Sequence, residues 1–531
     1  MIPEELKPEA SFSELELKGR VRLSQAYIQA LERGEKIDVI IKLKGIDFKE
    51  LRKEVGIETF QKLDKVSLLK QHARITQAPV INFMRREGIP VLNKLWLINA
   101  IVTRVDKEQL EKLASLEEVE EIFPNFEVKV PEPIKTEKVE IEEEDYTWGL
   151  KRIGAPQVWK MGYNGSGIRV CVLDTGVDIT HPDLQGKMWT DNPSDPTYPG
   201  GWIEFDSYGN IVRSSKPHDT HGHGTHVSGT VLGGNSSGIA IGVAPGAILM
   251  HGLVLPGGSG SVAQCIAGMQ WCIDPVDQYG NPAGQRANVS SMSWGAEGYY
   301  NEFIEVINAM REAGVVPVAA IGNGGEDTSC CPGNVYGAFG IGAVDKYDKV
   351  ASFSGGKTID WPESYPEPYI KPDFSAPGVN VYSSLPDGSY DYWSGTSMAT
   401  PHVAGTVALM KQANPNLTVD DIYDFLVYSS KDLGKEGKDI RYGWGIINAS
   451  LAVEYVSQAG GLKGYVYDAT SLNPPTWGAE IIVNGTINLT RTLGIDGSYS
   501  IVLPPGSYNL TVKAFGYEEN KTTITISPNE W

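Results

Sequence analysis

The central part of the chain, residues 147–457, alternates short apolar segments with helical patterns, and this alternation limits the folds open to it. Strand-like segments occupy 168–173, 247–253, 287–292, 315–320 and 337–344, and helical patterns occupy 260–272, 302–313 and 398–412. Strands separated by helices are typical of a parallel sheet with helices on both faces, because parallel strands need long crossover connections. The sequence therefore predicts an α/β domain over 147–457.

The regions on either side of this domain do not show the same alternation of strands and helices. Residues 1–130 predict a small α+β unit, with strand-like segments at 37–43 and 95–105 and helical patterns in parts of 62–86 and at 107–115. Residues 131–146 combine prolines with a run of acidic residues, which predicts a solvated linker open to proteolysis.

After Gly460 and Gly461 the pattern becomes short alternating strands divided by Gly, Pro and Asn. These strands lie at 464–466, 479–483, 498–502, 507–512 and 522–526. They predict a small all-β sandwich over 460–531.

The formal net charge of the 531-residue chain is −20, which argues against nucleic acid as a partner because a polyanion would repel it. The apolar stretches, such as 314–322, are too short to span a bilayer, so we expect no transmembrane segment. The first residues show no signal-peptide pattern. Nine Asn-x-Ser/Thr sequons nevertheless indicate an exported, extracellular protein whose signal peptide is not present in this sequence.

Five cysteines are too few for a disulfide scaffold and lack the paired spacing of a zinc site. Cys265 and Cys272 fall on one helical pattern about 10 Å apart, too far to bond each other. We expect the cysteines mainly to be buried small apolar residues. A disulfide that involves Cys330 or Cys331 stays open.

Three segments carry residues suited to chemistry. Asp174 ends an apolar strand and precedes Thr-Gly, where open α/β sheets place ligands. His223 opens His-Gly-Thr-His, whose small residues let a helix pack closely behind the imidazole. Ser397, in Gly-Thr-Ser-Met-Ala-Thr-Pro, opens an apolar helix whose positive end favours a developing negative charge. Each alone would read as a turn, packing or capping residue, but together they predict a nucleophile, its base and an orienting carboxylate.

These segments resemble the three catalytic motifs of the subtilisin-like (subtilase) family of serine peptidases. The resemblance extends over residues 147–457 and includes Gly-Val-Ala-Pro-Gly-Ala at 242–247, Ser-Trp-Gly at 293–295, Ala-Ala-Ile-Gly-Asn at 319–323 and Lys-Pro-Asp-Phe-Ser-Ala-Pro-Gly at 371–378. It implies a subtilisin-like sheet flanked by helices and a serine endopeptidase of broad specificity.

The resemblance also assigns roles. Ser397 would attack the scissile carbonyl, His223 would move the proton, and Asp174 would hold the imidazole tautomer. The side chain of Asn323 and the backbone N–H of Ser397 would stabilise the oxyanion. His226, three residues beyond the base, is interpreted as a helix-packing residue.

Family likeness places an extended peptide substrate between two short segments. One comprises Ser293, Trp294 and Gly295, and the other comprises Gly258, Ser259 and Gly260. Trp294 departs from the usual Leu, and Cys330 and Cys331 stand where the family places part of its S1 pocket wall, so side-chain preference stays open.

The family also binds calcium, and Asp183 matches a ligand position, with the loop 234–240 supplying further oxygens. Ser236 stands where an Asn ligand would be expected, and a turn-forming role for Asp183 is the alternative. The insertion 188–217 is expected to be a surface loop near the cleft. Asp191 and Asp195 there are further calcium candidates.

The flanking units have counterparts in known families too. Residues 1–130 resemble the inhibitory propeptides of subtilases, which implies an intramolecular inhibitor cut away within the 131–146 linker; the alternative is a permanent domain. Residues 460–531 resemble carboxypeptidase-regulatory-like sandwiches, notably in Asp-Gly-Ser-Tyr-Ser at 496–500. We expect a monomer that acts on proteins and peptides.

Two other functions are possible alternatives for such a chain. A catalytically dead subtilase that only binds is disfavoured by the presence of Asp174, His223, Ser397 and Asn323 together. An α/β-hydrolase esterase would carry its nucleophile in Gly-x-Ser-x-Gly and follow the order Ser, Asp, His, and this chain does neither.

Overall fold

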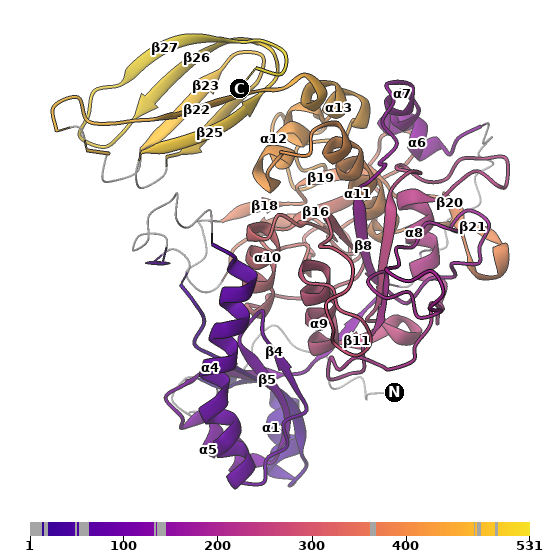
Figure 1. Cartoon of the computed structure of the whole chain (residues 1–531), viewed down its shortest axis with the longest axis vertical. Helices are drawn as coiled ribbons and strands as arrows, with labels where there is room; N and C mark the ends of the chain where they lie inside the picture. Colours follow the sequence, from indigo (N-terminus) through magenta and orange to yellow (C-terminus); the bar gives the residue numbers. More distant parts are fainter. Residues whose placement is uncertain are drawn as a thin grey trace.

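The structure is a computed structural model that describes residues 13–14, 20–47, 50–51, 63–131, 134, 145–361, 368–471, 473–474, 479–493 and 497–530. Figure 1 shows an N-terminal unit at the bottom, a central α/β domain, and a C-terminal unit of strands at the upper left. Most of the 131–146 linker, with its expected cleavage site, lies outside the described residues.

A seven-stranded sheet forms the centre of the α/β domain, and every strand pairing in it is parallel. In spatial order its strands are β19 (Phe374–Pro377), β16 (Phe339–Val344), β14 (Val316–Ala320), β12 (Val289–Met292), β8 (Arg169–Asp174), β10 (Ile248–Leu253) and β9 (Trp202–Glu204). The predicted parallel α/β fold is confirmed. One edge strand was not expected: β9 lies within the insertion interpreted as a surface loop.

Helices cover both faces of this sheet because alternate side chains of each strand point to opposite sides. Val170 and Val172 of β8 join a core with α8 and α11, while Cys171 and Leu173 join another with α9 and α10. The helices of the domain are α6 (Trp148–Ile153), α7 (Ala155–Lys160), α8 (His223–Leu232), α9 (Val262–Ile273), α10 (Glu302–Glu312), α11 (Thr396–Ala413), α12 (Val419–Ser429) and α13 (Ala449–Gln458).

Four small two-stranded pairings surround the main sheet. They are β11 (Ser259–Ser261) with β7 (Glu127–Lys129), β13 (Ala296–Glu297) with β15 (Cys330–Cys331), β17 (Lys357–Ile359) with β18 (Tyr369–Lys371), and β20 (Val381–Ser384) with β21 (Tyr390–Trp393). The first of these joins the N-terminal unit to the α/β domain.

The N-terminal unit is a four-stranded antiparallel sheet packed against helices, as the α+β pattern predicts. Its elements are β1 (Ser13–Glu14), β2 (Arg22–Leu23), α1 (Gln25–Glu32), β3 (Ile37–Leu43), α4 (Lys65–Arg86), β4 (Asn93–Leu95), β5 (Ala100–Val105), α5 (Lys107–Ala114) and β6 (Val119–Pro124). The segment expected as one strand at 95–105 is a hairpin, and Asn99, with φ 48°, provides its left-handed turn position.

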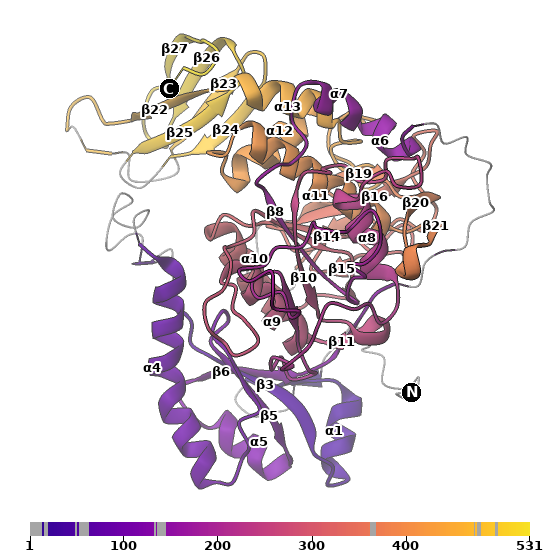
Figure 2. The ribbon, with the colours of Figure 1, turned by 45° about the vertical axis from the view of Figure 1, so that its right-hand side comes forward.

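Figure 2 shows this sheet lying across the end of the α/β domain, below α9 and β11. Ile40, Leu95 and Phe123 of the N-terminal sheet share a buried core with Ile266 and Phe303 of the α/β domain. The two units therefore fold against each other over an apolar interface, which burial of nonpolar surface stabilises.

The C-terminal unit contains two antiparallel sheets around its own core. One pairs β22 (Gly460–Tyr465) with β25 (Ser498–Leu503), and the other has the order β24 (Asn488–Thr492), β23 (Glu480–Asn484), β26 (Gly506–Lys513), β27 (Asn520–Ile526). The arrangement agrees with the predicted all-β sandwich, and β24 is the strand that the sequence pattern missed.

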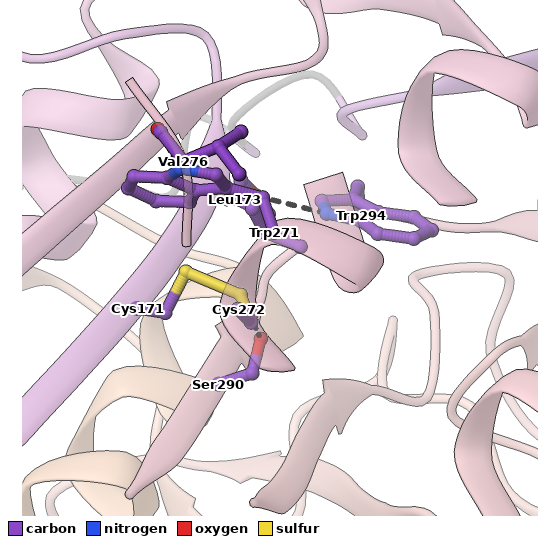
Figure 3. Close-up of a disulfide and its surroundings, with 7 residues drawn as sticks. All are labelled: Cys171, Leu173, Trp271, Cys272, Val276, Ser290 and Trp294. Atoms are coloured by element: carbon purple, nitrogen blue, oxygen red, sulfur yellow. Dashed lines mark hydrogen bonds between the residues drawn. A yellow bond between two sulfur atoms is a disulfide. The ribbon is translucent and has the colours of Figure 1, made fainter. Parts of the chain in front are cut away.

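A disulfide joins the sheet to a helix: Cys171 of β8 is bonded to Cys272 of α9, with their Cα atoms 6.0 Å apart (Figure 3). The expectation that the cysteines are buried small residues is wrong for these two. Residues separated by 101 positions meet because α9 packs on the face of β8 that carries Cys171. Cys265, Cys330 and Cys331 are free cysteines.

We expect the Cys171→Ala/Cys272→Ala double variant to lose about 2–5 kcal/mol of unfolding free energy, because a long closed loop would be released. Urea unfolding on a Ser397→Ala background, which prevents self-digestion, measures the loss. Cys265→Ala is the matched control, since Cys265 is equally buried in α9 without a disulfide. Equal losses in the control and the double variant would contradict a stabilising disulfide.

Candidate active site

The three candidate catalytic residues all lie at element ends. Asp174 is the last residue of β8, His223 is the first of α8, and Ser397 lies in the first turn of α11. Asn323 follows β14 closely. Because the carboxyl ends of parallel strands meet at one edge of the sheet, residues far apart in sequence gather there.

Asp174 and His223 form a buried pair. The Nδ1 of His223 lies 2.8 Å from Oδ1 of Asp174, and both side chains have 0% exposure. A carboxylate only accepts hydrogen bonds, so Nδ1 carries the proton and Nε2 keeps its lone pair. The Thr175 N–H also donates to Oδ1 at 2.8 Å, which fixes the carboxylate in turn.

Asp219 fixes the start of the helix that carries His223, a role that the sequence analysis did not predict. Its carboxylate accepts hydrogen bonds from the hydroxyls and backbone N–H groups of neighbouring residues: Thr175 Oγ1, His221 N, Gly222 N, and both N and Oγ1 of Thr225, at 2.6–3.0 Å. Burial works to raise the pKa of Asp219, but these hydrogen bonds outweigh it and hold the pKa below its ordinary value. The signal in the sequence was an acidic residue four positions before the histidine.

Gly224 allows α8 to approach β8 closely. A Cβ at this position would lie 2.0 Å from the carbonyl oxygen of Gly176, so no side chain fits. The Gly224 N–H donates to Thr175 Oγ1 at 2.9 Å. The turn after Asp174 and the start of the His223 helix are thus fixed to each other.

Ser397 faces Ser293 in a reciprocal arrangement. The Ser397 hydroxyl donates to the Ser293 carbonyl at 2.9 Å, and the Ser293 hydroxyl donates to the Ser397 carbonyl at 2.9 Å. Within the described part of the chain, no group hydrogen-bonds to Nε2 of His223. The structure thus joins Asp174 to His223, but directs the serine hydroxyl to a backbone carbonyl.

Asn323 is oriented by the residue before the serine. Its Oδ1 accepts from both the backbone N–H and the hydroxyl of Thr396, at 2.9 and 2.8 Å. With the oxygen so held, the amide presents Nδ2 as its donor. A Cβ on Gly395 would lie 3.2 Å from this Nδ2, so glycine keeps the space next to it open. Thr396 was not expected from the sequence.

The two expected substrate segments flank a strand of the N-terminal unit. Strand β7 pairs antiparallel with β11, so that Ser259 lies opposite Lys129 and Gly260 opposite Val128. Lys129 also exchanges both backbone hydrogen bonds with Gly295, at 3.4 and 3.1 Å. An extended peptide therefore already lies between the segments predicted to bind one.

The Val130 N–H adds a bond to the Gly258 carbonyl at 2.9 Å. Trp294, which stands in place of the usual Leu, turns its side chain away from the cleft. That side chain is fully buried and its Nε1 donates to the Leu173 carbonyl at 2.9 Å, as Figure 3 shows. Only the backbone of Trp294 is left to face a bound peptide.

His226 is a packing residue, as expected. Its ring stacks on Trp393 with centroids 4.8 Å apart, and Nε2 lies 3.3 Å from the Asp391 carbonyl. Burial lowers the pKa of His226 to about 3, so it stays neutral and takes no part in proton transfer at neutral pH. Trp393 also lies 6.2 Å from the His223 ring and forms part of the surroundings of the base.

Cys330 and Cys331 lie beside the cleft in β15, which pairs with β13. A Cβ on Gly295 would come within 2.8 Å of the Cys330 Cβ, so the Cys330 side chain packs directly on the cleft backbone. Burial raises the pKa of the Cys330 thiol to about 12, which leaves it protonated and weakly nucleophilic at neutral pH.

Asp183, the candidate calcium ligand, is surrounded by hydrogen-bond donors. It is buried, and its two carboxylate oxygens accept hydrogen bonds from Ser236 N–H at 2.6 Å and the Tyr390 hydroxyl at 2.9 Å. Gly234 N–H donates to its carbonyl at 3.0 Å. These neighbours are donors, whereas calcium needs further acceptor oxygens. Calcium at Asp183 stays a prediction.

The other calcium candidates have similar surroundings. Asp191 accepts from Trp189 Nε1 at 3.0 Å and from Gly284 N–H, and Asp195 accepts from Thr197 N–H at 2.9 Å. Among the described ranges, no group of three or more His, Cys, Asp or Glu side chains is arranged to hold a metal ion.

Comparison with known proteins bears on this geometry. Residues 165–445, more than half of the chain, match the model of the subtilase family. This chain belongs to the subtilase family. Subtilases are serine endopeptidases, and the chain is an enzyme of that class.

Three relatives illustrate the similarity. Subtilisin Savinase of Lederbergia lenta is 36% identical over 57% of the subtilase chain and 97% of its own length. The thermostable alkaline protease of Halalkalibacterium halodurans is 32% identical over 69% of the chain and 86% of its own length. Bacillopeptidase F of Bacillus subtilis (strain 168) is 32% identical over 89% of the subtilase chain. Bacillopeptidase F is much longer, and the match spans only 35% of its length.

We expect Asn323→Ala to lower kcat about 10²–10³-fold with little change in KM, because the amide would act only on the charge that develops in the transition state. Steady-state hydrolysis of a peptide anilide by mature enzyme measures both constants. Asn301→Ala, at the start of α10, is the matched control. A change confined to KM would contradict the oxyanion role.

Proposed function

We propose that this subtilase is a secreted, self-processing endopeptidase that cuts proteins with broad specificity. The observation that carries the proposal is the buried Asp174–His223 pair, whose Nε2 has no hydrogen-bond partner among the described residues, at the sheet edge shared with Asn323. A base with a fixed tautomer and an available nitrogen is what a serine nucleophile requires.

In the proposed reaction the Ser397 hydroxyl turns from the Ser293 carbonyl to Nε2 of His223 and attacks the scissile carbonyl. His223 takes the hydroxyl proton and then gives it to the leaving amine. Asp174 stabilises the imidazolium that forms in between. Asn323 Nδ2 and the Ser397 N–H donate to the oxyanion, and water then hydrolyses the acyl-enzyme by the same groups in reverse.

Broad specificity follows from the kind of contact that the cleft offers. Residues 127–129 pair with β11, and backbone hydrogen bonds join Lys129 to Gly295 and Val130 to Gly258. Main-chain pairing of this type stabilises an extended peptide with little demand on its side chains. We propose that protein substrates add to the cleft in the same way.

The N-terminal unit acts, in this proposal, as an intramolecular inhibitor that is removed on maturation. Its tail occupies the substrate path, and its sheet shares an apolar core with α9 and α10. Charges reinforce the contact: Lys42, which is almost fully buried, lies 2.6 Å from Glu305 of α10, and Arg22 lies 3.5 Å from Glu302. Such complementary pairs favour one orientation of the unit on the catalytic domain.

Secretion and a monomeric state belong to the same proposal. The sequons motivate the extracellular assignment, and the relatives include a subtilisin, Subtilisin Savinase. Among the helices that the structure describes, none combines the length and apolarity needed to cross a bilayer.

We expect the Ser397→Ala chain to remain at full length, because cleavage of the 131–146 linker would require its own serine. Denaturing gel electrophoresis and intact mass over time measure processing. Ser394→Ala, three residues before Ser397, is the matched control. Maturation of purified Ser397→Ala on the normal schedule would contradict self-processing. Adding a trace of active enzyme to Ser397→Ala distinguishes a cut made by another molecule.

A further inference from the structure

The register of the tail in the cleft, if continued by two residues beyond Lys129, would place a proline opposite Ser293. In an antiparallel pairing, hydrogen-bonded pairs recur every two residues, one strand rising as the other falls. Lys129 forms such a pair with Gly295. The next pair in the series is therefore Pro131 with Ser293, the residue whose carbonyl the Ser397 hydroxyl contacts.

Pro131 cannot complete that pair. A residue at this place would donate its backbone N–H to the Ser293 carbonyl, but proline has none. The Ser293 carbonyl instead accepts from the Ser397 hydroxyl at 2.9 Å. The Ser293 carbonyl, which a proline cannot engage, is therefore hydrogen-bonded by the hydroxyl of the catalytic serine.

The tail stays close to the serine beyond this point. Pro131 is half-buried, and the Ile134 N–H donates at 3.0 Å to the carbonyl of Ser394, three residues before Ser397. On the other side, Val128 and Val130 are buried in the core shared with the catalytic domain. The tail is therefore bound at both ends of the stretch that contains Pro131.

We propose that Pro131 makes the docked tail resistant to cleavage, so that the peptide bond after Pro131 is not cut and maturation is completed by a cut elsewhere. This inference rests on the proposed function. The proline has two effects. It withholds the backbone donor that would align residue 131, and it leaves the Ser293 carbonyl open to the Ser397 hydroxyl, which is then not directed at His223.

Restoring an N–H at residue 131 should reverse both effects. With the Ser293 carbonyl engaged by the tail, the Ser397 hydroxyl can turn to His223 and attack the carbonyl of residue 131. The carbon–nitrogen bond to Glu132 breaks, and the amine leaves with the proton carried by His223. Water then releases the new carboxyl end from Ser397, so that one peptide bond and one water give one acid and one amine.

The test compares the full-length wild-type chain, Pro131→Ala and Lys129→Ala by time-resolved mass spectrometry and N-terminal sequencing. We expect fragments that begin at Glu132 to form about tenfold faster in Pro131→Ala than in wild type, the effect of one well-placed hydrogen bond. Lys129→Ala is the matched control: it changes an exposed side chain of the same strand and keeps every backbone donor.

A second arm removes the dependence on self-processing. Synthetic peptides of residues 122–140, with Pro or Ala at 131, are given to mature enzyme whose activity on casein has been established. Cutting of the Ala peptide at 131–132, with the Pro peptide intact there, supports the proposal. Equal cutting of both peptides at this bond, or of neither, overturns it. An enzyme inactive on casein would instead refute the proposed function.

Discussion

The Asp219 carboxylate fixes the geometry on which the catalytic centre depends. It binds the Thr175 hydroxyl on one side and the N–H groups that open α8 on the other, so the strand bearing Asp174 and the helix bearing His223 are held by one buried anion. Hydrogen bonds to an ionised group are stronger than neutral ones. The close Asp174–His223 contact follows from this anchoring and from the glycine that lets the helix approach.

The parallel sheet supplies the other half of the arrangement. Strands β8, β12 and β14 are neighbours, and their carboxyl ends lead to Asp174, to the Ser293 segment and to Asn323 respectively. Helix α11 then brings Ser397 against Ser293 and Thr396 against Asn323. Each active residue is thus carried by rigid elements, which keeps its position well defined.

The N-terminal unit uses the same cleft geometry that would hold a substrate. Its strand β7 completes a backbone pairing that the catalytic domain leaves open, while its sheet buries apolar side chains on α9 and α10. Binding is therefore divided between an apolar interface, which gives strength, and a backbone register, which decides what lies next to the serine. The proposed role of Pro131 rests on continuing this register by two residues beyond Lys129.

The sequence by itself determined the fold class and named Asp174, His223 and Ser397, since apolar periodicity and short motifs are local properties. Asn323 was named through the resemblance of the chain to the subtilase family. The sequence did not predict Asp219 as an anchor, because an acidic residue in a turn has no distinctive pattern. Only the tertiary structure decided the remaining features. It paired Cys171 with Cys272, buried the Trp294 side chain, and set Lys129 of the tail opposite Gly295. Those relations depend on packing and strand register between distant segments, which no local pattern encodes.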